Sequence, residues 1–534
     1  MRKIAMKVLL LLAGNLCFAG VLLAQQTVKG YVFEDLNGNG NRDRREKGLA
    51  NVSVSNGREV VQTDTRGAYT LPCGDDQIVF VIKPSGYKTA LTDRNLPAFY
   101  YIHKPNGSPD LRYPGVRPTG PLPASVDFAL TRQSEDKAFT TLVFGDPQAY
   151  SLEEVDFFNR GVVEELRGVK EVAFGISMGD LVGNNPDLFN PYIEAVQRIG
   201  VPWYNVIGNH DINFDASSDA LSDESFEAHF GPANYAFNYG DVHFILLDNV
   251  FYPGAKDGKK VNYFAGFREE QLDFVENNLK FVPKDKLIVI GVHIPFVGRV
   301  KDQPVLRKPD AKRLFTLLKD FPHTLSISAH THIQHQQFIT RKQGWQQDKD
   351  HHHFNVGTTS GNWYSGEPDE QGIPAATMAD GTRKGYAFIR FNGNSYEIDY
   401  KVAGKPADYR MEISVPKILE RNKKTSAGIY VNYFLGGVKD TLYCRVGNGE
   451  WVQMNRVDEA DPSFTYLTQR WDYTDTLLAG RRPGDAKICT HLWRAPVPVK
   501  LPPGTHEVEI KVKDMFGRTF TQKKSYIIAE RRRD

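Results

Sequence analysis

The stretch TLSISAHTH, residues 324–332, places an alternating apolar run directly before two histidines. The alternation from Leu325 to Ala329 predicts a buried β-strand. Because side chains of a strand alternate between its two faces, His330 and His332 are expected to point the same way at the strand's end. That arrangement suits a metal, but short histidine pairs also occur on solvated loops. The rest of the chain has to decide between these two interpretations.

The surrounding region, from about residue 137 to residue 404, alternates apolar runs with amphipathic ones. The apolar runs predict strands at 139–146, 171–180, 201–211, 242–249, 286–295 and 324–330. The amphipathic runs predict helices at 152–168, 187–199, 269–282 and 309–321. A closing hairpin is expected at 386–405. This alternation predicts a layered α/β core.

Polar side chains follow the predicted strands at their carboxyl ends, where ligands collect in open α/β sheets. Glycine precedes three of them, so the backbone can turn sharply there. Carboxylate, amide and imidazole groups together suit Mn, Fe, Zn or a similar divalent ion. Seven such side chains are enough for two ions: Asp146, Gln148, Asp180, Asn209, His293, His330 and His332.

The order and spacing of these residues resemble the motifs of the calcineurin-like metallophosphoesterases. That family carries D-x-H, GDxx(D/N), GNH(D/E), a lone histidine and GHxH. This chain has DPQ at 146–148, GDLVGN at 179–184, GNHD at 208–211, His293 and AHTH at 329–332. The resemblance covers about residues 137–400. Gln148 and Ala329 depart from the pattern, and Gln148 puts the affinity and identity of the first metal in doubt, although some branches of the family carry glutamine there.

The resemblance implies a role for each of these positions. The first metal would take Asp146, Gln148 and His332, the second would take Asn209, His293 and His330, and Asp180 would bridge them. Two cations about 3.5–4 Å apart clamp a phosphate and lower the pKa of a shared water. The resulting hydroxide would attack phosphorus in line with the leaving oxygen. His210 would protonate that oxygen, and Asp211 would orient His210.

Residues 27–133 alternate apolar and polar residues between turns, which predicts a small β-sandwich. Within it, DLNGNGNRDRRE at 35–46 fits a twelve-residue calcium loop. The loop follows a strand rather than a helix, and it resembles the calcium loop of SdrD B-like and Cna-B-like surface domains. Calcium would stiffen the domain, and a plain polar turn is the alternative. The candidate calcium ligands are Asp35, Asn37, Asn39, Asn41, Asp43 and Glu46.

Residues 1–24 have a basic start followed by an apolar stretch, which predicts a secretory signal peptide. We therefore expect an exported protein, in the periplasm or at the cell surface, and membrane association only if this segment is retained as an anchor. Lys and Arg total 66 and Asp and Glu total 64, so no nucleic-acid partner is indicated.

Residues 406–530 predict a second β-sandwich that carries no catalytic constellation. Cys444 and Cys489 are expected to lie close enough to form a disulfide. The run His351–His353 is interpreted as a solvated loop in preference to a metal site. Trp363 and Tyr364 either line the substrate entrance or pack on the surface. With both flanking domains, the chain resembles multidomain bacterial calcineurin-like phosphoesterases.

The predicted architecture is α/β: a layered metallophosphoesterase β-sandwich core with flanking helices, between two small all-β sandwich domains. The predicted function is an exported, dinuclear-metal phosphoesterase acting on a small-molecule or glycan- or lipid-linked phosphoester. The alternative is a cell-surface binding or adhesion protein with a degenerate core. His210 and Asp211 argue against the alternative, because binding alone needs no general acid.

Overall fold

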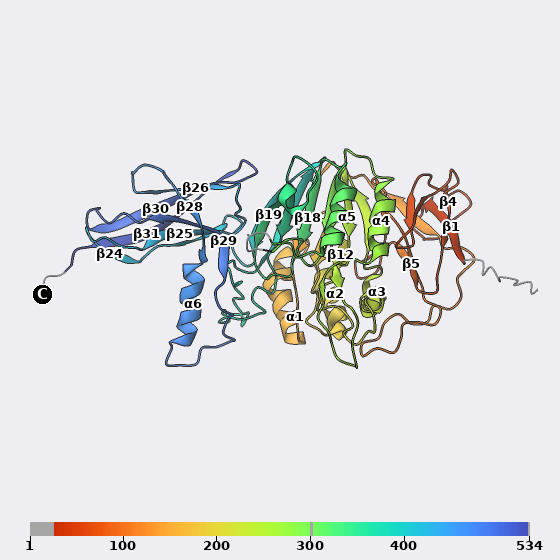
Figure 1. Ribbon diagram of the computed structural model, residues 1–534, viewed down its shortest axis with the longest axis horizontal. Coiled ribbons are helices and arrows are strands. Elements are labelled where there is room, and N and C mark those ends of the chain that lie inside the picture. Colours follow the sequence, from red (N-terminus) through yellow and green to blue (C-terminus); the bar gives the residue numbers. More distant parts are fainter. Residues whose placement is uncertain (1–25, 299–302, 532–534) are drawn as a thin grey trace, which may run out of the picture.

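The computed structural model describes residues 26–298 and 303–531, and three β-rich parts follow one another along its long axis (Figure 1). The predicted signal peptide, residues 1–24, lies outside the described residues. Within them, no helix is long and apolar enough to cross a membrane. The layered α/β core between β-rich flanks that the sequence predicts is confirmed.

The N-terminal part contains two sheets, in the orders β4-β1-β9-β6-β7 and β3-β2-β5-β8. Alternate side chains of β1 are buried, as the period of a half-buried strand requires. The strands are β1 (Thr27–Glu34), β2 (Ser53–Ser55), β3 (Val60–Gln62), β4 (Ala68–Pro72), β5 (Gln77–Val81), β6 (Tyr87–Leu91), β7 (Pro97–Ala98), β8 (Tyr100–His103) and β9 (Phe128–Arg132).

Two larger sheets form the central core, in the orders β12-β11-β10-β21-β22 and β13-β14-β17-β18-β20-β19, and β15 pairs with β16 in a separate two-stranded sheet. The β10, β11 and β12 strands run parallel, as do β14, β17, β18 and β20. The strands are β10 (Ala138–Phe144), β11 (Phe174–Met178), β12 (Trp203–Val206), β13 (Tyr235–Tyr239), β14 (Val242–Leu246), β15 (Val250–Phe251), β16 (Phe264–Ala265), β17 (Leu287–Gly291), β18 (Thr324–Ser328), β19 (His335–Ile339), β20 (His351–Asn355), β21 (Gly385–Asn392) and β22 (Ser395–Val402).

Aromatic side chains join the two central sheets face to face. Phe174 of β11 meets Phe244 of β14 with ring centroids 5.4 Å apart, and Tyr204 of β12 stacks on Phe237 of β13 at 4.1 Å. Such contacts contribute about 0.5–1.5 kcal/mol each beyond the burial of their area. The sandwich therefore has one apolar core, and parallel strands of both sheets carry their carboxyl ends to the same edge.

The four helices predicted for the core are confirmed. The first begins at Ser151, whose side chain accepts a hydrogen bond from the Glu154 N–H, and it continues past its α-helical turns as π and 3₁₀ turns to Leu166. The short helix α3 was not predicted, because seven residues are too few for a clear helical period. The helices are α1 (Leu152–Phe158), α2 (Phe189–Gln197), α3 (Glu224–Phe230), α4 (Glu269–Leu279) and α5 (Lys308–Leu318).

The C-terminal part also contains two sheets, β23-β25-β29-β28 and β24-β31-β30-β26-β27. Its helix α6 (Pro462–Asp472) was not predicted, although Asp461 caps it and Pro462 opens it. The strands are β23 (Met411–Ser414), β24 (Ile418–Glu420), β25 (Gly428–Tyr433), β26 (Thr441–Val446), β27 (Val452–Gln453), β28 (Asn455–Ala460), β29 (Ile488–Pro496), β30 (Gly504–Lys513) and β31 (Thr519–Ala529).

Two predictions from the sequence are wrong. Cys444 and Cys489 form no disulfide with each other: both are free and buried. They lie on β26 and β29, which belong to different sheets of the C-terminal part. His351–His353 do not form a solvated loop: they are the first three residues of the strand β20, and all three are buried.

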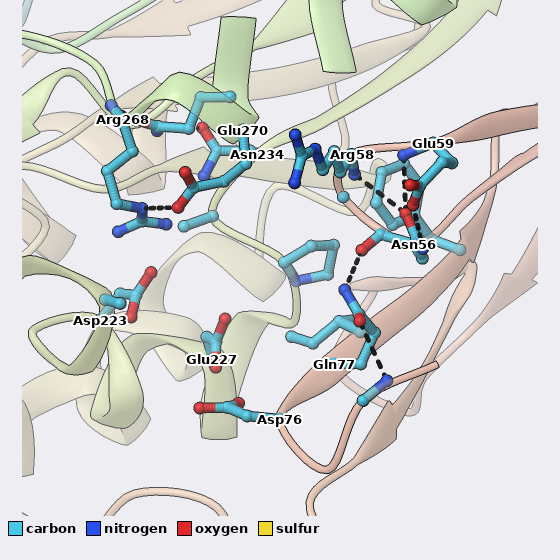
Figure 2. A pocket seen from close by; sticks show the side chains of 18 of the residues that line it. Asn56, Arg58, Glu59, Asp76, Gln77, Asp223, Glu227, Asn234, Arg268 and Glu270 are labelled. Atoms are coloured by element: carbon cyan, nitrogen blue, oxygen red, sulfur yellow. Dashed lines mark hydrogen bonds and ion pairs between the residues drawn. The ribbon is translucent and has the colours of Figure 1, made fainter. Parts of the chain in front are cut away.

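A cleft of about 430 Å³ marks the junction between the N-terminal part and the core (Figure 2). Ion pairs cross this junction, from Arg58 to Asp273 at 2.9 Å and from Lys104 to Glu224 at 2.5 Å. Acidic groups such as Asp223 face the cleft, and burial raises the pKa of Asp223 to about 7. None of the predicted metal ligands lines this cleft, so it is a junction of two parts of the chain and not the predicted site.

Candidate metal centre

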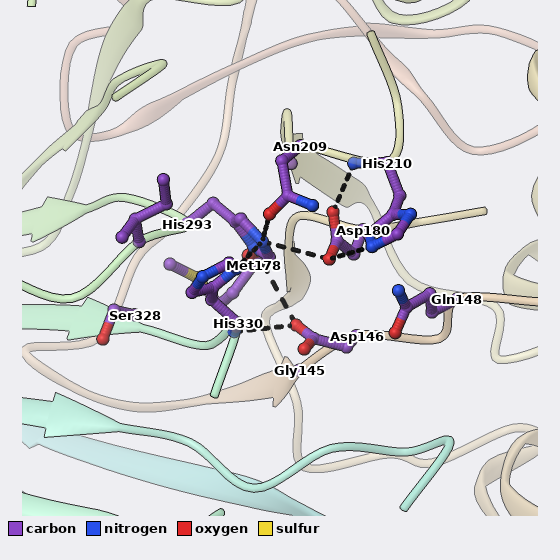
Figure 3. A network of polar contacts seen from close by, with 12 residues as sticks. Gly145, Asp146, Gln148, Met178, Asp180, Asn209, His210, His293, Ser328 and His330 are labelled. Carbon is purple, nitrogen blue, oxygen red and sulfur yellow. Dashed lines mark hydrogen bonds and ion pairs between the residues drawn. The ribbon is translucent and has the colours of Figure 1, made fainter. Parts of the chain in front are cut away.

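Loops from five strands bring the predicted metal ligands together at one edge of the sandwich (Figure 3). These loops follow β10, β11 and β12 in one sheet and β17 and β18 in the other. Asp180, His293 and His330 offer ligand atoms that all lie within 4.8 Å of one another. The group joins two loops of one sheet edge to a loop of the other, as expected for parallel strands whose carboxyl ends coincide.

His293 is the centre of one half of the site. Its Nε2 lies 3.2 Å from Asp180 Oδ2, 3.1 Å from Asn209 Oδ1 and 3.2 Å from His330 Nδ1. Its Nδ1 lies 2.8 Å from the Met178 carbonyl, which requires an N–H there. The Nε2 is therefore the atom that faces the other ligand atoms, and a carbonyl that fixes the ring in this way is typical of histidines that bind metals.

His332 is arranged in the same way in the other half. Its Nδ1 donates to the Gly361 carbonyl at 2.7 Å, and its Nε2 lies 3.2 Å from Asp146 Oδ2. That carboxylate oxygen is buried without a hydrogen-bond partner among the residues that the structure describes, and so is Gln148 Oε1. Buried acceptors without a donor are costly unless a cation satisfies them. These oxygen and nitrogen atoms thus form a ligand set that fits a divalent ion between Asp146, Gln148 and His332.

The charges of the centre also favour a cation. Burial opposes protonation of His293, but the carboxylates of Asp180 and Asp146 outweigh it and raise its pKa to about 9. Burial raises the pKa of Asp146 to about 7. Burial lowers the pKa of His330 to about 3 and that of His332 to about 4, so both rings are neutral at pH 7 and keep a lone pair for a metal.

The backbone is held in a rare conformation at the ligand positions. Five of the predicted ligand residues have positive φ, which residues other than glycine rarely adopt. They are Asp146 at 33°, Gln148 at 39°, Asp180 at 51°, His330 at 70° and His332 at 52°. Such residues cost about 1–3 kcal/mol each and persist where the surroundings over-determine them, often at functional sites. The two histidines lie on a loop, because β18 ends at Ser328. Both side chains therefore reach the centre from this loop and not through the alternation of a strand.

At two glycines of the motifs, neighbouring atoms lie too close to the backbone for any side chain to fit. A Cβ on Gly179 would lie 2.5 Å from His293 Nδ1, and a Cβ on Gly208 would lie 2.0 Å from the Asp180 nitrogen. Both distances are shorter than any normal contact. Glycine therefore allows the loops after β11 and β12 to pack against each other and against His293.

His210 lies beside the ligands, with its backbone N–H donating to Asp180 Oδ1 at 2.7 Å and its Nε2 4.0 Å from Asp180 Oδ2. Its Nδ1 lies 2.8 Å from Asn184 Oδ1, which fixes an N–H at that nitrogen. Burial lowers the pKa of His210, and the Asp180 carboxylate partly opposes this shift. Asn184 was not predicted as a site residue, although it is the last residue of the GDLVGN motif.

The prediction that Asp211 orients His210 is wrong. The Asp211 carboxylate accepts hydrogen bonds from the backbone N–H groups of Gly208, Leu181 and Val182, at 2.8, 3.1 and 3.1 Å. Burial and the nearby Asp180 raise the pKa of Asp211 to about 8. Asp211 therefore ties the loop after β11 to the loop after β12, and Asn184 is the residue that contacts the imidazole.

The sequence left open whether Trp363 and Tyr364 line the substrate entrance or pack on the surface, and the two residues lie in different surroundings. The partly exposed Trp363 stacks on His332 with ring centroids 4.2 Å apart. Tyr364 is buried, and its hydroxyl donates to the Pro147 carbonyl. Trp363 thus lies at the rim of the centre, and Tyr364 packs beneath the loop that carries Asp146 and Gln148.

The loop at 35–46 is closed by its own hydrogen bonds. Asp35 accepts from the N–H groups of Gly38 and Gly40, at 2.7 and 2.9 Å. Glu46 accepts from the N–H groups of Leu36 and Asp43, both at 2.9 Å. The amides of Asn37 and Asn39 donate to Asp43, and the Asn41 N–H donates to Asn39. Calcium binding at this loop stays a prediction.

Family models match three consecutive parts of the chain. Residues 36–112 match the N terminal of Calcineurin-like phosphoesterase, residues 139–334 match Calcineurin-like phosphoesterase, and residues 353–520 match the C terminal of Calcineurin-like phosphoesterase. In these three parts the chain is similar to the calcineurin-like phosphoesterases. The chain carries a calcineurin-like phosphoesterase domain between the N- and C-terminal domains described for that family.

Individual proteins are more distant. The chain is 33% identical over 76 residues to Colossin-A from Dictyostelium discoideum, a match that covers 14% of this chain and 1% of Colossin-A. A dimetal phosphatase from Danio rerio aligns at 15% identity and a TM-score of 0.34, covering 49% of this chain and 98% of that one. A purple acid phosphatase from yellow lupin (Lupinus luteus) seeds aligns at 13% identity and a TM-score of 0.35, covering 66% and 67%.

Proposed function

We propose that the chain hydrolyses a phosphomonoester or phosphodiester with two divalent ions, Mn, Fe or Zn, held at this centre. Asp146, Gln148 and His332 would hold the first ion, Asn209, His293 and His330 would hold the second, and Asp180 would lie between them. One observation carries the proposal: ring nitrogens and side-chain oxygens face one another across about 3 Å. Two oxygens of the centre, Asp146 Oδ2 and Gln148 Oε1, are also buried without a hydrogen-bond donor among the described residues. Such a set of acceptors calls for cations.

When bound, the two ions would neutralise phosphate oxygens and lower the pKa of a water molecule. The chain's own residues would supply orientation and a proton. His210, in its imidazolium form, would donate a proton from Nε2 to the leaving oxygen, while its Nδ1–H stays engaged by Asn184. The Asp180 carboxylate favours that form, because it opposes the lowering of the His210 pKa by burial. Gln148 Nε2 donates to the Tyr150 hydroxyl at 3.3 Å, and this contact would hold the amide oxygen toward the first ion.

The place of action and the calcium ion are further parts of the proposal. The basic and apolar residues 1–24 support export to the periplasm or the cell surface. The acidic and amide side chains of 35–46 support a calcium ion in the N-terminal part. The substrate would be a small-molecule or glycan- or lipid-linked phosphoester.

The test is metal content by mass spectrometry together with turnover of aryl phosphate monoesters and diesters. We expect about two ions per chain and hydrolysis of at least one substrate class. Asp180→Asn should abolish turnover, because the carboxylate between the two sites is lost. A chain that holds two ions but cleaves neither class would favour the alternative, a binding protein with a degenerate core.

A further inference from the structure

A cleft of about 560 Å³ opens beside the metal centre and reaches the C-terminal part of the chain. Tyr150 and Trp363 line it from the core, and Arg481 and Arg482 line it from the loop between α6 and β29. The Arg481 carbonyl accepts from the Gly366 N–H at 2.6 Å, which fixes this loop against the core. The cleft is thus built by two parts of the chain that are distant in sequence.

The two aromatic residues join this cleft directly to the metal centre. The Tyr150 hydroxyl lies 3.5 Å from His210 Nδ1 and accepts from Gln148 Nε2. Trp363 stacks on His332. A phosphoester held at the centre would therefore extend its leaving group between these two rings, on the side of the general acid His210.

The two arginines differ in their partners. Arg482 is neutralised by Asp472, at 2.6 and 2.7 Å, and by Asp485 at 2.9 Å. Arg481 is exposed, and its guanidinium makes no hydrogen bond or ion pair with any residue in 26–298 or 303–531. The acid of this cleft, Glu154, accepts from the Tyr150 N–H at 2.7 Å. Burial raises the pKa of Glu154, and the positive charge of Arg481 opposes this shift although the two side chains form no ion pair. Arg481 is thus the cation of this cleft that no carboxylate of the described residues contacts directly, and it is left for a bound anion.

We propose that this cleft binds the leaving group of the substrate, and that the substrate class is a phosphoester whose leaving group carries a ring and a second anionic group. The ring would lie against Trp363 and Tyr150, whose faces offer apolar area and a polar edge. The anionic group would lie on Arg481, whose planar guanidinium matches carboxylate and phosphate. The Ser365 hydroxyl, buried in the lining without a hydrogen-bond partner among the described residues, would serve a polar group of the same ligand. The inference rests on the proposed function.

The test compares two substrates with similar leaving groups, phenyl phosphate and 4-carboxyphenyl phosphate, on the metal-loaded full chain. We expect the wild type to favour the carboxylated ester in kcat/KM. Arg481→Gln should lower kcat/KM for that ester about five- to tenfold, as expected for one charged contact in a partly enclosed cleft, and should change that for phenyl phosphate little. Trp363→Ala should lower kcat/KM for both esters, since both carry a ring.

Arg481→Lys is the matched control, and it should recover part of the loss because it keeps the charge but not the planar fork. Unchanged metal content and an unchanged melting temperature would show that each variant is folded. Equal losses for both esters would place Arg481 on the reacting phosphate and overturn the inference. No preference of the wild type for the carboxylated ester would also overturn it, while hydrolysis of phenyl phosphate would leave the proposed function standing. If neither monoester is cleaved while an aryl phosphodiester is, the inference fails and the proposed function stands. If no phosphoester is cleaved, both fail.

Discussion

At the scale of single residues, neighbouring histidines have different tasks because their second ring nitrogens have different partners. His293 and His332 engage backbone carbonyls through Nδ1 and turn Nε2 to the centre. His210 engages Asn184, and only its backbone N–H reaches a predicted ligand within hydrogen-bond distance. A ring held at the edge of the centre is suited to transfer a proton.

Replacing His210 by alanine should therefore leave both metals bound and slow turnover by about 10²–10⁴-fold, the range expected for a general acid. The slowing should be smallest for an aryl phosphate, whose leaving group needs little protonation. The measurement is metal content alongside turnover on a good and a poor leaving group. Asn184→Ala is the matched control, with a smaller loss, because the ring remains but its orientation is freed. Loss of metal from the His210 variant would make it a ligand.

Changing His330 or His332 to alanine should each remove metal from a different site. His330 Nδ1 contacts His293, whereas His332 Nε2 contacts Asp146. Each variant should therefore retain about one ion per chain. The check is metal titration followed by calorimetry, which resolves the two sites if their affinities differ. Loss of both ions from either single variant would contradict the division of ligands between two sites.

At the scale of elements, the parallel pair β18 and β20 forms a buried polar ladder below the metal centre. Thr324, Ser326 and Ser328 face His351, His353 and Asn355, with five hydrogen bonds of 2.6–3.0 Å between the two strands. Asn355 continues the ladder by donating to Thr331 at 2.7 Å. The ladder thus ends on the residue between His330 and His332.

The direction of every bond in this ladder follows from its last step. Ser328 donates to the side-chain amide oxygen of Asn355, so it must accept from Nε2–H of His353. The Nδ1 of His353 then accepts from Ser326, which in turn accepts from Nε2–H of His351. Both rings therefore carry their proton on Nε2 and are neutral. This order holds the metal-binding loop only while the rings stay uncharged.

The ladder predicts instability in acid. Burial lowers the pKa of His351 and of His352 to about 3 and that of His353 well below its ordinary value. Below about pH 6.5 the unfolded chain therefore binds more protons than the folded one. As the pH is lowered, the free energy of unfolding decreases by up to about 1.4 kcal/mol per pH unit for each histidine. Denaturant unfolding of the core between pH 7 and pH 5 measures this slope.

His352→Phe is the matched control for the acid slope. This ring lies on the opposite face of β20, stacked on Phe338 at 5.0 Å, and takes no part in the ladder. The substitution should remove the contribution of one histidine to the pH dependence of the free energy of unfolding and leave the ladder intact. A slope that is the same in wild type and variant would show that these buried rings do not govern acid stability.

The N-terminal loop at 35–46 allows a separate prediction at the same scale. If it binds calcium, Asp35→Ala should lower the melting temperature of the N-terminal transition in calcium more than in chelator, since an ion that binds only the folded state stabilises it by mass action. Scanning calorimetry of the full chain measures both conditions. Arg44→Ala is the matched control, because its side chain is exposed and is not among the candidate calcium ligands. Equal effects of Asp35→Ala in both conditions would make the loop a polar turn.

At the scale of the whole molecule, the C-terminal part contacts the segment that follows the metal-binding loop. His491 of β29 lies 3.1 Å from the Asp380 carboxylate, which accepts from the Gln334 N–H two residues after His332. Cys489 Sγ lies 3.4 Å from the same imidazole. All three side chains are buried, and burial raises the pKa of the Cys489 thiol well above its ordinary value, so this Cys-His-Asp group is structural and not nucleophilic.

Replacing His491 by alanine should destabilise the chain by about 3 kcal/mol or more, because it leaves a buried carboxylate without its partner. Burial alone would raise the pKa of Asp380, but His491 and two backbone N–H groups hold it below its ordinary value. The variant should also lose the first metal more readily, through the Gln334 contact. Cys489→Ala should cost less and keep the metal. Melting curves and metal content check both, and equal losses in the two variants would contradict the role given to the ion pair.

The sequence by itself determined the features that are local in the chain. Strands that end in glycine and a ligand, and the core helices α1, α2, α4 and α5 with an apolar face, are encoded within a few consecutive residues. Helix α6 was missed although its cap is equally local. The layered core and the set of strand-end side chains were predictable for that reason. Even Gln148 could be singled out, because it departs from a motif that can be seen in three residues.

Only the tertiary structure decided which neighbours these residues have. His210 is held by Asn184 and not by the adjacent Asp211, because the two loops pack through backbone amides that Asp211 fills. His351–His353 are buried although three histidines in a row are polar, because serines of another strand satisfy two of the rings. Arg481 meets Tyr150 across more than three hundred residues. Such pairings depend on how separate elements pack, and no local pattern of side chains carries that information.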